Sequence, residues 1–170
     1  MEFNQMDIAF HKNGEFHHVS VNRGHSIYAV SDMLCRFGDA GWEITSVIVW
    51  DGAGQTETVS ITLPLDGQVA DLFYELDRHP YMCEKAVAFL LAFGWGEWDS
   101  EEYSDRCFGE FDNPEQFAVE NTSIHAYQGL KIDIPEWVEV DWAATARNLE
   151  TEYNYTLQRH NGSVFAFGNS

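Results

Sequence analysis

The segment TLQRHNGSVFAF, residues 156–167, is the clearest fold signal in this chain. Two β-rich runs, 156–160 and 163–167, are separated by the dipeptide Asn161-Gly162. This dipeptide favours a type I′ turn, because asparagine and glycine accept the positive φ angles that the turn requires. The sequence therefore predicts that the chain closes with a β-hairpin.

Residues 1–63 show a similar pattern with one helix added. A Lys12-Asn13-Gly14 turn predicts a first hairpin. A helix is expected over 26–37, because its apolar residues recur at helical spacing and Gly38 follows them. Strands are expected at 6–10, 16–21, 43–50 and 56–63.

Residues 64–106 carry helical signals. Asp66 is a candidate N-cap for a helix whose apolar face consists of Val69, Leu72, Phe73 and Leu76, with Asp71 and Glu75 on the opposite face. Pro80 begins the next helix, which is apolar nearly all round over 87–93 and ends at Gly94. Asp99 and Glu102 have the spacing of a capping box and predict a short acidic helix.

Residues 107–170 combine both kinds of signal. A strand is expected at 107–111, and Asn113-Pro114-Glu115-Gln116 has the N-cap, first-turn proline and capping-box glutamine of a helix start. Asp141 is expected to cap a further helix. The predicted fold is α+β, an elongated chain of three small domains: an α+β domain at 1–63 with a small antiparallel sheet plus a helix, a helical domain at 64–106, and a domain at 107–170 with an antiparallel sheet plus helices.

Charge is the unusual feature of the composition. Nine lysines and arginines stand against 28 carboxylates, which gives a net charge of −19, while 45% hydrophobic residues indicate a globular protein. Residues 97–152 hold fifteen carboxylates and three cations, a net charge of −12. Folded acid repels itself and costs stability, so its retention suggests a use. Such a surface argues against nucleic acid and anionic membranes as partners and favours a basic partner. Adaptation to salt would also make a protein acidic, but it would spread the charge over every surface.

The sequence lacks the common motifs for catalysis and metal binding. It has no Walker A or GxSxG motif, and its seven histidines lack metal-ligand spacing. With 28 carboxylates, a glycosidase pair can be chosen anywhere, so an enzyme of sugar chemistry is a remote alternative. Three cysteines without a CxxC pair, no signal peptide and no long apolar run predict a cytoplasmic protein. We expect no catalytic residue, no metal and no cofactor.

Several segments of the C-terminal third follow one another in a recognisable order. They are CFGEFDNPEQFA at 107–118, LKIDIPE at 130–136, VDWAATARNL at 140–149 and NGSVFAF at 161–167. This part of the chain resembles the ArdA family of antirestriction proteins, which plasmids, phages and conjugative elements carry. The helical pattern of 64–106 is similar as well.

The resemblance implies a DNA mimic. Proteins of this family are elongated, are built of three small domains and dimerise through the C-terminal domain. Their carboxylates imitate the phosphate path of bent B-form DNA and occupy the DNA-binding groove of type I restriction–modification enzymes. The candidate phosphate surrogates here are Glu97, Asp99, Glu101, Glu102, Asp105, Glu110, Asp112, Glu115, Glu120, Asp133, Glu136, Glu139 and Asp141.

A homodimer is expected to form through residues 107–170. Its candidate contacts are Val164, Phe165 and Phe167, because an apolar C-terminal strand has an edge that needs cover. With twice the charge of −19, the dimer would match at most roughly 65 Å of duplex, or about 19 base pairs.

Two alternatives remain open besides a type I enzyme. The mimic could be directed at another nucleic-acid machine such as a CRISPR effector, or the protein could be an acidic adaptor or chaperone for a basic protein. The placement of the carboxylates separates them, because mimicry needs a continuous stripe and an adaptor needs only a local patch.

Overall fold

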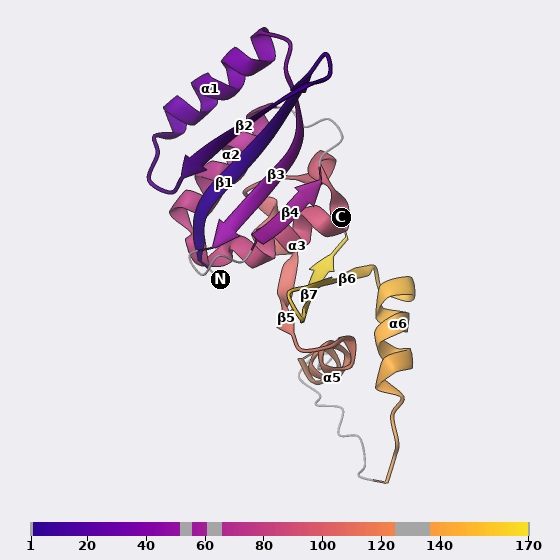
Figure 1. The fold of residues 1–170 in the computed structure, drawn as a ribbon. Helices are drawn as coiled ribbons and strands as arrows, with labels where there is room; N and C mark the ends of the chain where they lie inside the picture. Colours follow the sequence, from indigo (N-terminus) through magenta and orange to yellow (C-terminus); the bar gives the residue numbers. More distant parts are fainter. Residues whose placement is uncertain (1, 52–55, 61–65, 125–136, 170) are drawn as a thin grey trace. The chain divides into compact units, whose positions relative to one another are not determined.

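The computed structural model describes residues 2–51, 56–60, 66–124 and 137–169 (Figure 1). The chain divides into two compact units, Met1–Ser104 and Asp105–Ser170. Each unit combines an antiparallel sheet with helices, which confirms the α+β class. No helix within the described residues is both long and apolar enough to cross a membrane.

The N-terminal unit is built on a four-stranded sheet with the order β2-β1-β3-β4 (Figure 1). All neighbouring strands are antiparallel. The predicted first hairpin is confirmed, because Asn13 and Gly14 both have positive φ, at 50° and 83°. The strands are β1 (Phe3–Lys12), β2 (Glu15–Asn22), β3 (Glu43–Asp51) and β4 (Thr56–Ser60).

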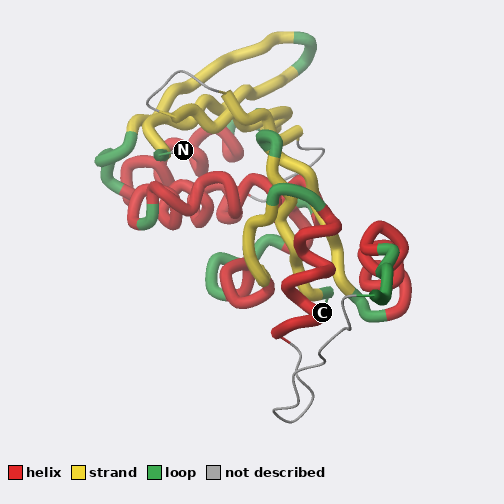
Figure 2. The backbone as a smooth tube through the Cα atoms, turned by 90° about the horizontal axis from the view of Figure 1, so that it is seen from below, coloured by secondary structure: helices red, strands yellow, loops and turns green. Residues whose placement is uncertain are grey.

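Helices cover one face of this sheet, as Figure 2 shows. Met6 and Ile8 of β1 point into the core, where Phe3 meets Phe73 edge-on at 5.9 Å. At the other end of β1, Phe10 stacks on Phe37 at a ring separation of 4.1 Å. The helical segments are α1 (Ile27–Asp39), α2 (Asp66–Arg78), the 3₁₀ turn η1 (Pro80–Met82), α3 (Cys83–Phe93), the 3₁₀ turn η2 (Trp95–Glu97) and α4 (Glu102–Arg106).

The domain prediction differs from these two units. The sequence predicts separate domains at 1–63 and 64–106, whereas the structure places most of both in one compact unit. The reason is that α2 buries its apolar face in the core of the sheet, through Phe73, and packs beside α1. The apolar periodicity of α2 shows which face of the helix is buried, but it does not show which element that face packs against. The remaining boundary, after Ser104, lies close to the predicted one at 107.

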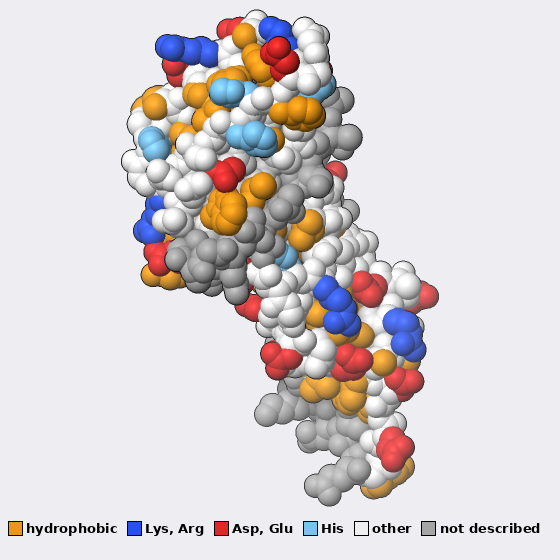
Figure 3. Space-filling view, viewed as in Figure 1, with side chains coloured by type: hydrophobic (Ala, Val, Ile, Leu, Met, Phe, Trp, Pro, Cys, Tyr) orange, Lys and Arg blue, Asp and Glu red, His pale blue; other side chains and the backbone are white. Residues whose placement is uncertain are grey.

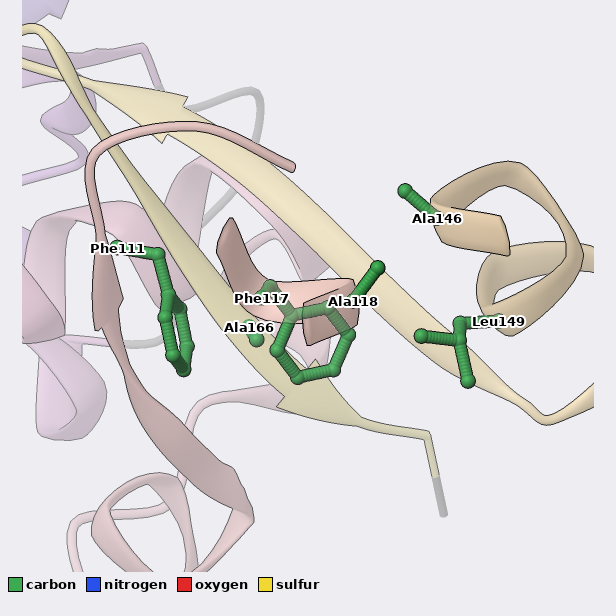
Figure 4. Packing of buried hydrophobic residues seen from close by; sticks show 6 residues of the cluster. All are labelled: Phe111, Phe117, Ala118, Ala146, Leu149 and Ala166. Carbon is green, nitrogen blue, oxygen red and sulfur yellow. The ribbon is translucent and has the colours of Figure 1, made fainter. Parts of the chain in front are cut away.

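In its described residues, the C-terminal unit holds a three-stranded sheet with the order β5-β7-β6 and two helices. Figure 4 shows the core, in which side chains of β5, β7, α5 and α6 meet. The rings of Phe111 and Phe117 pack edge-on at 5.1 Å in this core. Its elements are β5 (Cys107–Phe111), α5 (Pro114–Ile124), α6 (Trp142–Glu152), β6 (Tyr155–His160) and β7 (Ser163–Gly168).

The closing hairpin is confirmed, since Asn161 and Gly162 have φ of 49° and 81°. The reasoning that gave its last strand a free edge is wrong, because β7 lies between β5 and β6. Val164, Phe165 and Phe167 are all buried within a single chain. Side chains this deeply buried in one chain are not exposed for contact with a second copy. The homodimer itself stays a prediction.

Candidate partner-binding surface

The candidate phosphate surrogates are divided between the two units. Asp133 and Glu136 lie outside the described residues. The acidic stretch is continuous in sequence, but two folded units carry it. The N-terminal unit holds Glu97, Asp99, Glu101 and Glu102, and the C-terminal unit holds Asp105, Glu110, Asp112, Glu115, Glu120, Glu139 and Asp141.

Most of these carboxylates face solvent. Ten of the eleven described ones are exposed, and only Glu120 is half-buried, where it accepts a hydrogen bond of 3.0 Å from Gln116. Leaving aside Glu97 and Glu120, none of them forms an ion pair with a described lysine, arginine or histidine. Their charge is therefore available to a partner.

Asp71 of α2 anchors the acidic segment of the N-terminal unit. One carboxylate oxygen accepts a hydrogen bond from the indole N–H of Trp98 at 3.0 Å, and the other accepts one from the Ser100 hydroxyl at 3.1 Å. The Asp71 side chain is half-buried and Trp98 is buried. Both bonds hold the backbone on either side of Asp99 against the helix.

Two further side chains of α2 extend this attachment. The Gln68 amide donates to the backbone carbonyl of Trp95 at 2.7 Å, and Glu75 accepts from the Tyr103 hydroxyl at 3.4 Å. Gln68, Asp71 and Glu75 are spaced at i, i+3 and i+7, so they share one face of the helix. That face is the one the sequence assigns to Asp71 and Glu75, but it is bonded to protein. Trp98 bonds Asp71 of this face and Tyr103 bonds Glu75. The spacing of these two aromatic residues was a signal in the sequence that the prediction did not use.

Aromatic packing gives the segment a firm base. Trp98 and Tyr103 stack at 5.0 Å, and both rings meet Phe89 of α3 edge-on at 6.1 and 6.3 Å. Above this base, one oxygen of Asp99 accepts from the backbone N–H of Glu101 at 2.8 Å and of Glu102 at 3.0 Å. Asp99 thus caps α4 as predicted, and the two glutamates project from its capped start.

An open hollow of about 440 Å³ lies beside the segment. Asp99, Glu101 and Asp71 contribute carboxylates to its lining, while Gly67 and Gln68 come from α2. Predicted surrogates and their anchor Asp71 thus share one concave surface.

Helix capping also fixes the carboxylates that follow β5. Asn113 accepts from the backbone N–H of Gln116 at 2.8 Å, and the Gln116 side chain accepts from the N–H of Asp112 at 2.6 Å. The predicted helix start is confirmed, with the return bond made one residue earlier than in a standard capping box. Glu110 accepts from the Ser163 hydroxyl at 2.6 Å, across the sheet.

The start of α6 holds the last surrogates. Asp141 accepts from the backbone N–H of Ala144 at 2.9 Å, which confirms the predicted cap. Glu139 is exposed in the segment before the cap, close in sequence to Trp137, which is 84% exposed. A cap holds its carboxylate at a fixed place, so α6 presents a preset charge at its N-terminus.

Both units are acidic, nearly in proportion to their length, and one stretch of the chain is not. Seventeen carboxylates against five cations give Met1–Ser104 a net charge of −12, and eleven against four give Asp105–Ser170 a net charge of −7. Residues 8–31 break the pattern, because two cations and a single carboxylate, Glu15, give them a net charge of +1. Figure 3 shows histidine and hydrophobic side chains gathered over this part of the N-terminal unit.

Within the described residues, no three histidine, cysteine, aspartate or glutamate side chains lie where they could hold one metal ion. What the arrangement does offer is a fixed display of exposed carboxylates on two folded units. Comparison with protein-family models, with curated proteins and with solved structures gives no match for this chain.

Proposed function

We propose that this protein is a DNA mimic that inhibits a DNA-binding defence enzyme, foremost a type I restriction–modification enzyme, by occupying its DNA-binding groove. The observation that carries the proposal is the exposure of ten of the eleven described candidate carboxylates, several of which lie at helix starts and caps. Enzymes that bind DNA contact its phosphates regardless of sequence, so a mimic needs fixed negative charge and no catalytic group.

Rigidity supports the proposal as much as charge does. The segment with Glu97–Glu102 is held by Asp71 and by stacked aromatic rings, and Asp99 and Asp141 are fixed as helix caps. Charges held in place lose little conformational entropy when they dock. Attraction at long range would also speed the encounter with a basic groove.

The distribution of charge supports a directed surface over general adaptation to salt. Adaptation would acidify every surface, whereas residues 8–31 carry a net charge of +1 in a chain of −19. The resemblance of 107–168 to the ArdA family favours a type I enzyme as the target.

The test compares two triple variants that remove the same charge. The first neutralises candidate surrogates, E101Q, E115Q and D112N, and the second neutralises exposed carboxylates elsewhere, E43Q, E152Q and D39N. Inhibition of DNA cleavage by a purified type I restriction–modification enzyme is measured for both. At about 0.5 kcal/mol for each exposed charge, the first triple should weaken inhibition roughly tenfold.

The control triple should stay within about threefold of the unmodified protein, because its side chains lie off the proposed surface. Adding E102Q, D105N and E139Q to the first triple should bring the loss to roughly a hundredfold. Equal effects of the two triples would mean that only total charge matters, and that no mimic surface exists.

A further inference from the structure

Among the residues that the structure describes, no strand pairs with the outer edge of β2. β2 is an edge strand of the N-terminal sheet, and its eight residues pair with β1 without a bulge. The backbone N–H of Arg23 donates to the carbonyl of Asn4 at 2.8 Å. Because bonded residues alternate in an antiparallel pair, every second residue counted back from Arg23 bonds to β1. The residues between them, Phe16, His18 and Ser20, turn their backbone N–H and C=O groups outward.

These outward groups meet no hydrogen-bond partner among the residues that the structure describes. Phe16, His18 and Ser20 are also exposed. The next outward residue, Asn22, is satisfied differently: its N–H donates to the ring of His25 at 2.9 Å, and its carbonyl accepts from the His25 N–H at 3.1 Å. The open edge therefore spans the middle of β2 and stops at its end.

The outer edge of β6, in the C-terminal sheet, is protected by side chains. On β6, the outward N–H of Leu157 donates to Glu150 of α6 at 3.2 Å, and the carbonyl of Arg159 accepts from the side chain of Gln158 at 2.8 Å. Natural sheets protect their edges with lysine, proline, bulges or such side-chain contacts. β2 has no lysine or proline and no bulge in its pairing, which makes it a template for another strand.

Charge limits which strand can dock there. Residues 8–31 carry a net charge of +1, while Asp7 lies opposite Ser20, and Glu2 and Asp77 bond Arg23 and Gly24 at the end of β2. The edge is therefore less acidic than the segment 97–152 and attracts a basic partner less. It is also a place where two copies of a strongly acidic protein can approach with little local repulsion. We propose that a second copy of this chain adds its own β2 to this edge, in an antiparallel pair about a two-fold axis.

The register follows from the symmetry. An axis at His18 places it opposite His18 of the second copy, and Phe16 opposite Ser20 of the second copy. The outward groups then form about six backbone hydrogen bonds. On the other face, Glu15 lies diagonal to Arg23 of the second copy, within reach for long side chains. Arg23 already forms an ion pair with Glu2 of its own chain, so Glu15 of the second copy would join that pair.

Association through β2 should depend on salt concentration differently from binding to a basic groove. Raising the salt from 0.1 to 1 M shortens the screening length from about 10 to about 3 Å, which removes the repulsion between two acidic units. Salt should therefore strengthen pairing through β2, whereas it should weaken binding to a basic groove. The two proposals can fail independently, since β2 lies outside the acidic surface.

The experiment measures self-association of the full-length protein by sedimentation equilibrium at both salt concentrations. We expect at least one association step to tighten tenfold or more in 1 M salt. The variant H18K places two lysines face to face at the axis and should weaken that step at least tenfold. The matched control Y81K adds the same charge at a 75% exposed side chain on η1 and should change it less than twofold. Circular dichroism confirms that both variants are folded.

Cross-linking provides a second measurement. With C35S removing the exposed native thiol, the variant H18C should be joined to a second copy by a short thiol-to-thiol linker, and Y81C should not. Association that salt does not strengthen, equal effects of H18K and Y81K, or equal cross-linking at positions 18 and 81 would each overturn the proposal.

Discussion

Asp71 is predicted to hold the acidic segment of the N-terminal unit in place. The variant D71A removes both acceptors at once, the one that binds the Trp98 indole and the one that binds the Ser100 hydroxyl. The change leaves the backbone of α2 intact, because alanine favours helices. Its effect therefore reports on the attachment of the segment.

The magnitude follows from the two bonds and from the burial of Trp98. Hydrogen bonds to a charged group contribute about 1.5–3 kcal/mol each, and the half-exposed position of Asp71 favours the low end or less. Trp98 is only 6% exposed, so its N–H would lose its partner where water has poor access. We expect the free energy of unfolding to fall by about 2–4 kcal/mol. D71N keeps one oxygen acceptor and should lose about half as much.

Urea unfolding followed by tryptophan fluorescence measures this loss. Four of the six tryptophans, Trp42, Trp50, Trp95 and Trp98, lie in the N-terminal unit, so the signal reports mainly on that unit. D39A is the matched control, because Asp39 is an exposed carboxylate at the end of α1, and its removal should change stability by less than about 0.5 kcal/mol. A loss in D71A no larger than that in D39A would refute the anchoring role.

Three further predictions concern the C-terminal unit. F117A truncates a side chain that is 2% exposed and should lower the free energy of unfolding by about 3–5 kcal/mol, enough to broaden or abolish the thermal transition of this unit. The control V119A, at a 41% exposed position of the same helix, should leave that transition in place. D141A should lower the free energy of unfolding by about 1 kcal/mol in urea titrations, and D141N should lower it by much less, because asparagine also caps helices. Equal losses in the two variants would show that the cap of Asp141 does not stabilise α6. Light scattering of H18K, in which pairing through β2 is weakened, should give about twice the chain mass of 19.4 kDa at micromolar concentration in moderate salt, and a value near 19 kDa would contradict the homodimer through 107–170.

Local signals in the sequence predict local structure well in this protein. The dipeptides Asn13-Gly14 and Asn161-Gly162 specify their turns through backbone preferences of two residues, and both hairpins form as expected. The caps Asn113 and Asp141 act within four residues of the chain, and both are confirmed. Each of these features depends on neighbours in sequence, so no knowledge of the fold is needed.

Features that depend on distant residues could not be predicted in the same way. β7 becomes a central strand because β5, more than fifty residues earlier, pairs with its second edge. No pattern within β7 indicates that pairing, so the apolar run looked like an exposed edge. Asp71 belongs to the same class, because its partners Trp98 and Ser100 follow after three intervening helical segments.

The candidate surface was predicted by residue type and only partly by place. Exposure of the carboxylates follows from their charge, and ten of the eleven described ones are exposed. The division of the acidic stretch between two units depends on where the chain folds into separate cores. The near-neutral stretch 8–31 is visible in the sequence, but its meaning depends on the open edge of β2.

Competition with DNA tests the central claim most directly. A purified type I restriction–modification enzyme is bound to a labelled duplex that contains its recognition site, and this protein is titrated in at 0.1 M and at 0.5 M salt. We predict that protein and duplex exclude each other, and that the affinity of the protein for the enzyme falls steeply at the higher salt, because exposed charge pairs are screened. A complex that holds duplex and protein together, or an affinity that hardly changes with salt, would contradict mimicry.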